Sequence, residues 1–257
     1  MKKEIEKILN NLEVSFLPTN NQIDEIERWL IIEQYKTKEG FYCNWDILLS
    51  SYLNKQLAII SQNNNVIGFV TWRITSEYTA RIEIAEIEPE FRGKGVVREL
   101  IHQLFNLLRQ KNIVAVDLQC TPASSEPAWK HLGFHDFPEN SDRFLTKTPE
   151  AKKLYINIIP SQEKTFNINI YETIELWNDE PDMTKDQTQA TFNWNIEFKN
   201  GTRELLKPII FPGKPDWRIR WKANGITIKD DKVKYFVKEI DFGEFIIIKE
   251  IPKASNV

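Results

Sequence analysis

The residues best suited to chemistry in this 257-residue sequence lie in the loop Arg92-Gly-Lys-Gly-Val-Val97, between an expected strand and an expected helix. The first turn of a helix has backbone N–H groups without partners and carries the positive end of the helix dipole. Gly93 and Gly95 let the main chain approach an anion closely, because no Cβ atom intervenes. Arg92 and Lys94 add positive charge. The loop therefore predicts a site for a phosphate or pyrophosphate group.

A short Gly-x-Gly loop is also typical of a purely structural turn before a helix, and the loop alone does not separate the two interpretations. Its spacing does exclude two common phosphate-binding loops. The P-loop requires Gly-x4-Gly-Lys-Ser/Thr, and the dinucleotide-binding loop requires Gly-x-Gly-x-x-Gly. Residues 92–97 match neither pattern.

The loop resembles the coenzyme A-binding motif of the GNAT superfamily of N-acetyltransferases, which is written Arg/Gln-x-x-Gly-x-Gly/Ala. Arg92 and Gly95 occupy its first and fourth positions, and Ile87-x-Pro89 matches the hydrophobic-x-Pro approach to the loop. The expected strand at 114–118 and the segment 128–134, which ends in Gly-Phe, are similar to the late strand and closing helix of the family.

This resemblance covers about residues 1–147 and implies an α/β (α+β) acyl-CoA acyltransferase fold, with a mixed twisted sheet flanked by helices. It also implies acetyl-CoA as the co-substrate, without a metal. The pantetheine arm would lie along the strand before the loop, and the loop amides would hold the pyrophosphate. The residues implied to bind the coenzyme are Ala85, Glu86, Ile87, Arg92, Gly93, Lys94, Gly95, Val96 and Val97.

Two residues depart from the family pattern. Val97 stands where Gly or Ala is usual, and its β-branched side chain crowds the start of the helix. Trp129 stands where many members have a Tyr that protonates the leaving thiolate, and an indole N–H is no practical general acid. Cys120, Ser124, Ser125 or water are the alternative proton donors.

These departures leave two functional hypotheses open. In the first, the protein moves an acetyl group from acetyl-CoA to a primary amine of an unknown small molecule or peptide by direct attack. In the second, it is a catalytically inactive acyl-CoA-binding or scaffold protein, whose β domain mediates protein interaction.

Aminolysis of a thioester needs a neutral amine, so a base or a water chain must remove a proton from the incoming ammonium group. Glu83 and Glu86 lie on the strand expected before the loop. Their side chains should point to opposite faces, because they are an odd number of residues apart. Glu83 is our candidate general base. An ordinary charge on the strand surface is the competing interpretation for either residue.

The acceptor is expected near residues 28–46, because in the family it is bound by the early helices and loops. Aromatic residues cluster there, at Trp29, Tyr35, Phe41, Tyr42 and Trp45. They indicate an apolar or ring-bearing acceptor, although packing in the core explains them equally well.

The first part of the sequence alternates helical and extended patterns. Apolar residues at helical spacing predict helices over residues 1–12, 20–30, 44–53, 97–109 and 125–132, the second of them capped by Asn20 or Asn21. Shorter apolar runs predict strands over residues 14–17, 57–60, 66–75, 80–87 and 114–118. The polar run at 62–65 predicts a tight turn, since Asn tolerates the positive φ that such a turn requires.

After residues 146–150 the pattern changes to short β-type runs without a long helical stripe. Strands are expected over residues 154–159, 167–176, 192–198, 205–211, 217–221, 226–228, 233–237 and 245–251. Asn200-Gly201 and Asn224-Gly225 are hairpin signals. The sequence therefore predicts an acetyltransferase-like domain over residues 1–148 and a small all-β, sandwich-like domain over 151–257.

The role of the second domain stays open between shaping the acceptor site, recruiting a protein substrate and forming a homodimer. Its tryptophans are expected either in the sandwich core or on a carbohydrate- or peptide-binding surface, with the core favoured. They are Trp177, Trp194, Trp217 and Trp221.

Composition excludes several other classes. A formal charge of −3 gives no basic footprint for nucleic acid or an anionic membrane. Two cysteines and three histidines do not make a disulfide framework or a metal site at short spacing. No run approaches the roughly 18 apolar residues of a membrane span, and the first residues lack the apolar core of a signal peptide. We therefore expect a reduced, cytoplasmic protein.

Overall fold

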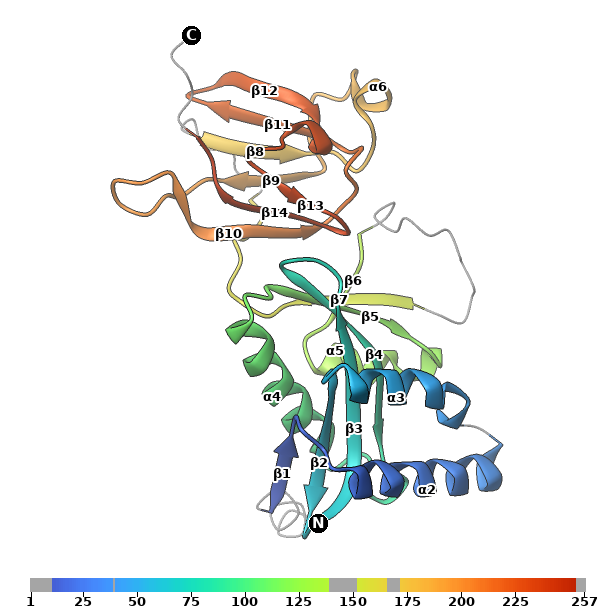
Figure 1. Cartoon of the computed structure of the whole chain (residues 1–257). Coiled ribbons are helices and arrows are strands. Elements are labelled where there is room, and N and C mark those ends of the chain that lie inside the picture. The colour runs from blue at the N-terminus through green and yellow to red at the C-terminus, as the bar shows by residue number, and fades with distance from the viewer. Residues whose placement is uncertain (1–10, 39, 139–151, 166–171, 253–257) are drawn as a thin grey trace. The chain divides into compact units, whose positions relative to one another are not determined.

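The computed structural model describes residues 11–38, 40–138, 152–165 and 172–252 (Figure 1). Contacts divide the chain into two compact units, Met1–Phe134 and His135–Val257. The domain limits at 148 and 151 stay a prediction, because residues 139–151 lie outside the described part of the chain. The helix expected over residues 1–12 also falls almost wholly on residues outside it.

The first unit is built on a mixed sheet whose strands follow one another in chain order. They are β1 (Leu12–Ser15), β2 (Leu57–Gln62), β3 (Asn65–Ile74), β4 (Thr79–Ile87) and β5 (Ala115–Cys120). Neighbouring strands are antiparallel except β4 and β5, which are parallel. Strand β2 and the middle of β3 are buried on both faces, which explains their continuous apolar runs.

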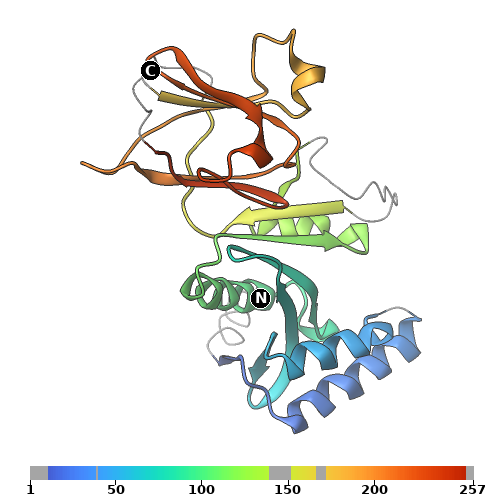
Figure 2. The ribbon, with the colours of Figure 1, turned by 45° about the horizontal axis from the view of Figure 1, so that its top comes forward.

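Helices cover both faces of this sheet (Figures 1 and 2). They are α2 (Asn20–Thr37), α3 (Trp45–Leu53), α4 (Val96–Gln110) and α5 (Glu126–His131), with short 3-10 turns η1 (Tyr42–Asn44), η2 (Pro89–Phe91) and η3 (Ala123–Ser125). Helices α2 and α3 lie side by side and share one apolar cluster with β2, β3 and β4, which includes Ile26, Leu30, Leu48, Phe69 and Ile84.

Local signals predicted much of this unit. The expected helix over 97–109 is confirmed as α4, and Asn63 and Asn64 take the positive φ expected of the β2–β3 turn. The cap expected at Asn20 or Asn21 is wrong. Thr19 caps α2, because its hydroxyl accepts from the Gln22 amide while the Gln22 side chain accepts from the Thr19 amide.

The second unit is largely β-structure. It contains the antiparallel pair β6 (His135–Asp136) and β7 (Lys152–Asn157). A three-stranded sheet has the order β10 (Glu204–Pro212), β14 (Phe245–Glu250), β13 (Asp241–Phe242). A four-stranded sheet has the order β12 (Ile226–Lys232), β11 (Arg218–Ala223), β8 (Glu172–Leu176), β9 (Phe192–Asn195). A short helix, α6 (Pro181–Thr184), and a 3-10 turn, η4 (Val233–Tyr235), complete it.

Side chains from both sheets form one core, so the sandwich-like architecture is confirmed. Trp194, Trp217 and Trp221 belong to this core and are each at most 3% exposed, which confirms the core interpretation for these three rings. Trp177 is also buried, but it lies outside that cluster, with the guanidinium groups of Arg218 and Arg220 over its ring. The strand expected over 233–237 is wrong. Residues 233–235 form η4, where a spacing of three places both Val233 and Phe236 in the core.

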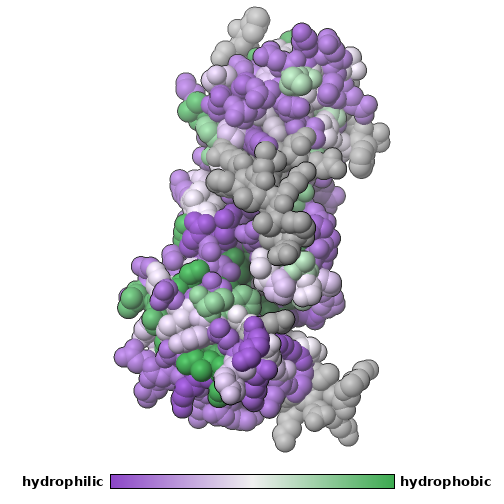
Figure 3. Space-filling model, turned by 90° about the vertical axis from the view of Figure 1, so that its right-hand side faces the viewer, coloured by the Kyte–Doolittle hydropathy of each residue, from purple (hydrophilic) through white to green (hydrophobic). Residues whose placement is uncertain are grey.

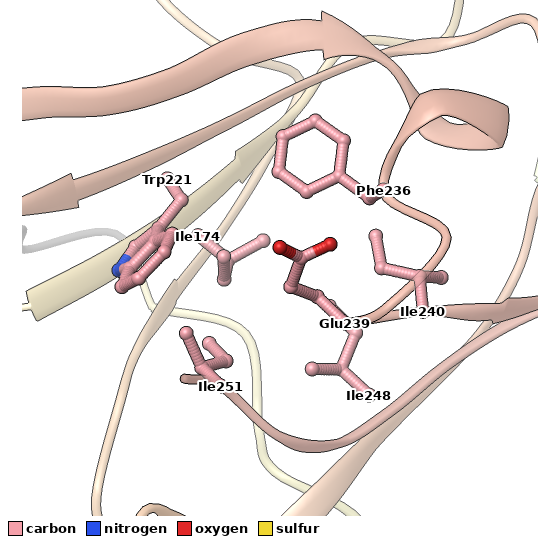
Figure 4. A pocket seen from close by; sticks show the side chains of 7 residues that line it. All are labelled: Ile174, Trp221, Phe236, Glu239, Ile240, Ile248 and Ile251. Atoms are coloured by element: carbon pink, nitrogen blue, oxygen red, sulfur yellow. The ribbon is translucent and has the colours of Figure 1, made fainter. Parts of the chain in front are cut away.

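Figure 4 shows one part of this core, where Ile174, Trp221, Phe236 and Ile248 surround a space with no room for a water molecule. The carboxylate of Glu239 lies among these apolar groups (Figure 4). Its Oε2 atom is 3.4 Å from Nζ of Lys229, so the half-buried charge has a partner.

Candidate functional site

The central feature of the first unit is an opening between β4 and β5. Strand β3 pairs with β4 from Ala80 to Ile87, whereas β5 pairs with β4 only from Thr79 to Ile82. The register of β3 and β4 shifts at Thr71 and Trp72, which makes Glu83 an extra residue in β4. Residues 83–87 therefore have no β5 partner and border a gap in the sheet.

The backbone direction in this stretch follows from its hydrogen bonds. The amide of Ile84 donates to Oγ1 of Thr71 (3.1 Å) and that of Glu88 to the carbonyl of Ile67 (2.9 Å), so both point towards β3. Because alternate residues of a strand pair on opposite sides, the polar groups of Ala85 and Ile87 face the opening and those of Glu86 face β3. The family resemblance implies that the Glu86 backbone contacts the pantetheine arm. This geometry does not favour that contact, which stays a prediction.

The loop after β4 has the conformation of an anion cradle. Gly93 and Gly95 adopt φ values of 73° and 84°, and no side chain caps α4, which follows directly. Among the residues that the structure describes, the amides from Gly93 to Val97 make no hydrogen bond. The Val96 side chain is buried in the core, so this residue offers only its amide to a ligand.

The two cations of the loop are placed differently from each other. Lys94 is half-buried, with Nζ 5.4 Å from the centre of the Phe91 ring. The Arg92 guanidinium does not extend over the loop. Its Nε donates to the carbonyl of Ile87 (2.8 Å), and Nη2 donates to Oε1 of Glu33 (2.5 Å) and of Glu86 (2.9 Å). The expected charge of Arg92 near the phosphates is thus directed towards α2 and β4.

Glu33, Glu86 and Arg92 form a cluster at the open end of β4. Glu33 is 8% exposed, and its Oε2 is buried without a partner among the described residues. The side chain of Glu86 is 13% exposed, and its Oε1 also accepts from the Ile87 amide (3.1 Å). Burial raises the pKa of Glu86, the positive charge of Arg92 lowers it, and the negative charge of Glu33 raises it.

Sequence reasoning missed Glu33. A readable signal existed, because Glu33 continues the spacing of Ile26 and Leu30 on the apolar stripe of α2. A carboxylate on the buried face of a helix needs a partner. The identity of that partner, 59 residues further along the chain, had no local signature.

Glu83 has a different partner, and the extra residue that it forms in β4 interrupts the alternation from which opposite faces were expected. It pairs with Arg73 of β3, and its side chain is 27% exposed. Glu86, in contrast, meets α2 through Arg92 and Glu33. Of the two carboxylates, Glu86 is the one linked to α2, through Arg92.

Trp129 and the three side chains considered as alternative proton donors lie in different surroundings. Trp129 is half-buried and packs edge-on against Phe134, with ring centres 5.3 Å apart. Cys120 ends β5 and is buried. Oγ of Ser125 donates to the carbonyl of Pro122 (2.8 Å), whereas Ser124 is exposed.

The early aromatic residues divide into two groups. Trp29 is buried, and Phe41, Tyr42 and Trp45 pack half-buried against the same cluster, as core packing predicts. Tyr35 is 79% exposed, and Ile32 and Ile47 are also exposed. Apolar side chains gather on the surface of this unit among charged ones (Figure 3).

The parted β4–β5 pair and the glycine loop before α4 define the class of protein: an acyl-CoA acyltransferase fold. Residues 20–134 match the model of the "Acetyltransferase (GNAT) family", and this part of the chain belongs to that family. The match does not extend into the second unit.

Related proteins are distant. An "uncharacterized N-acetyltransferase in lysA 3′ region" of Bacillus methanolicus is 22% identical over 113 residues, which are 44% of this chain and 80% of that protein. Ard1 from Thermoplasma volcanium has 19% identity and a TM-score of 0.46, over 58% of this chain and 99% of that chain. A Thermoplasma acidophilum PaiA N-acetyltransferase, solved in complex with coenzyme A, has 13% identity and a TM-score of 0.45, over 57% and 98%.

The described residues contain no group of three or more His, Cys, Asp or Glu side chains that could hold a metal ion. Within the same residues, no helix is long and apolar enough to cross a membrane.

Proposed function

We propose that the protein transfers the acetyl group of acetyl-CoA to a primary amine of a small molecule or peptide in the cytoplasm, by direct attack of the amine on the thioester. One observation carries the proposal: the opening beside β4 leads directly to the uncapped start of α4. Ala85 would offer backbone groups to a pantetheine arm, and the amides of Gly93 to Val97, which make no hydrogen bond in the described structure, would hold a pyrophosphate.

We assign the general base to Glu86 rather than to Glu83. A base works best when its pKa lies near the working pH, and burial raises the pKa of Glu86 towards that range. Glu86 is also linked through Arg92 to α2, near which the acceptor is expected, while Glu83 is held by Arg73.

In this scheme Glu86 takes one proton from the incoming ammonium group. The neutral nitrogen then attacks the thioester carbon, the C–S bond breaks, and the amide forms with loss of the second proton. The departing thiolate takes up one proton. Because an ordinary thiol has a pKa of about 8.5, water can supply that proton near neutral pH, so Trp129 does not prevent turnover.

The test measures thiol release from acetyl-CoA with a panel of polyamines, amino acids and peptide N-termini, beside direct calorimetric binding of acetyl-CoA. We expect Glu86→Gln to lower kcat by about 10²- to 10⁴-fold with unchanged affinity for acetyl-CoA. Glu83→Gln is the matched control and should retain wild-type kcat. The reverse result would return the base to Glu83.

Trp129 favours a second candidate function, a catalytically inactive acyl-CoA-binding or scaffold protein whose β domain mediates protein interaction. Persistent acetyl-CoA binding without turnover across the whole panel would support it. Absence of acetyl-CoA binding would overturn both candidates.

We also propose that the protein forms a homodimer, and sedimentation equilibrium of the full chain tests it.

A further inference from the structure

The second unit contains a cavity of about 490 Å³ that the acetyl-transfer proposal does not use. Its walls come from β7, from the segment 159–164 that follows β7, and from β9 and β10. Trp194 and Phe211 line it with aromatic rings, and Asn157, Lys164 and Lys207 line it with polar groups. All of these residues belong to one compact unit.

The ammonium group of Lys164 is the first feature that indicates a ligand in this cavity. Its Nζ lies 4.9 Å from the centre of the Phe211 ring and 5.1 Å from that of Phe192, and these two rings are themselves 4.6 Å apart. Across the described part of the chain, the ammonium group has no hydrogen bond or ion pair. Burial lowers the pKa of Lys164. Aromatic faces attract a cation but do not replace a counter-ion.

Four other lysines of this unit have carboxylate counter-ions. The pairs Lys153–Glu244, Lys222–Glu175, Lys232–Glu180 and Lys234–Asp216 are all formed. Lys207, like Lys164, forms none with the described residues, and both line the same cavity. One carboxylate, that of Glu163, also lines the cavity. The cavity therefore has an excess of positive charge.

Asn157 adds a directional group. Its Nδ2 donates to Oγ of Ser161 (3.0 Å) and to the carbonyl of Ile210 (3.1 Å), so both amide protons are used and the side chain is fixed. Its Oδ1 is buried and has no partner among the described residues. A buried carbonyl oxygen without a donor is costly, and a ligand that carries an N–H or O–H group would satisfy it.

We propose that this cavity binds a small organic anion with a ring or other apolar body. The carboxylate or phosphate of the ligand pairs with Lys164 and Lys207. Its apolar body lies against the rings of Trp194 and Phe211. A ligand that also carries an N–H or O–H group donates it to Oδ1 of Asn157, and the anionic group and the ring alone suffice for binding. This proposal does not depend on acetyl transfer in the first unit.

The test titrates the full-length protein with benzoate and, separately, with phenyl phosphate, by calorimetry. Benzamide, which has the shape of benzoate without its charge, is the ligand control. We expect at least one anion to bind ten times more tightly than benzamide, with an affinity that falls as salt rises. The anion that binds more tightly shows whether the cavity prefers a carboxylate or a phosphate. Equal binding of benzamide and benzoate, or no binding of either anion, would overturn the proposal.

Lys164→Met keeps an aliphatic stem over the rings and removes the charge. We expect it to weaken binding of the anion at least tenfold, and Lys207→Met to weaken it less. Lys238→Met, an exposed lysine of the same unit outside the cavity, is the matched control and should stay within twofold of wild type. Unchanged affinity in Lys164→Met would also overturn the proposal. The benzoate–benzamide comparison on the wild type decides the matter if that variant does not fold.

Discussion

The buried carboxylates of the two units differ in how completely they are paired. In the second unit, Oε2 of Glu175 meets Nε of Arg220 at 2.6 Å and Oε1 meets Nζ of Lys222 at 2.9 Å. In the first unit, Glu33 and Glu86 share one guanidinium, and Oε2 of Glu33 has no partner in the described structure.

This difference separates a structural use of charge from a functional one. A carboxylate with a cation on each oxygen holds two strands together and has no free capacity. Two carboxylates on one cation repel each other, and the repulsion contributes to the raised pKa of Glu86. Perturbed groups of this kind, placed at an opening, are typical of active sites.

Removing the fully paired carboxylate should have the largest effect on stability. Glu175→Gln leaves Lys222 without its anion and leaves Arg220 with Asp230 alone, at 3.8 Å, and we expect a loss of about 3 kcal/mol in the free energy of unfolding. Urea denaturation measures it. Glu204→Gln breaks the exposed pair with Lys199, where both side chains are about half exposed, and should cost less than about 1 kcal/mol. Equal losses would contradict the comparison.

A pair of glycine substitutions separates backbone strain from ligand binding. Gly93 and Gly201 have φ values of 73° and 75°, and a Cβ atom at either position meets no other atom within 4 Å. Alanine at either position should therefore cost about 1–2 kcal/mol through strain alone. Only Gly93→Ala should also weaken acetyl-CoA binding, as measured by calorimetry. If both variants bind acetyl-CoA like the wild type, the cradle is assigned wrongly.

Neutralising Glu33 should change the pH dependence of acetyl transfer. Glu33→Gln removes a negative neighbour of Glu86 and releases Arg92 to pair with Glu86 alone, and both changes lower the pKa of Glu86. The acidic limb of the profile of kcat/KM against pH should therefore move to lower pH. An unmoved limb would show that Glu33 and the base are not coupled.

The smallest expected effect concerns stability and pH. A carboxyl group whose pKa is raised by folding stabilises the protein below its unfolded pKa, and this contribution is lost as pH rises through the raised value. Wild type should therefore lose stability relative to Glu86→Gln as the pH rises above 4.5, the ordinary pKa of a glutamate, through the raised pKa of Glu86. Melting temperatures over that rise in pH measure it, and a constant difference would refute the raised value.

The parts of the fold set by local sequence were predictable. Helix α4, its glycine loop and the Asn63–Asn64 turn each depend on neighbours a few residues away. The cluster of Glu33, Glu86 and Arg92 was not, because it joins α2 to β4 through the tertiary fold. The extra residue at Glu83 has no glycine or other local mark, so the opening of the sheet could be expected only from the family resemblance.

One buried hydroxyl group stabilises the irregular pairing of β3 and β4 beside the opening. Thr71 is fully buried, and its Oγ1 accepts the Ile84 amide at the place where the β3–β4 ladder shifts. Valine at 71 would keep the volume but leave that amide without an acceptor. Strand β4 could restore a regular ladder only by sliding one residue, and such a slip turns every side chain to the other face. Thr71 thus decides which side of the sheet Glu86 occupies.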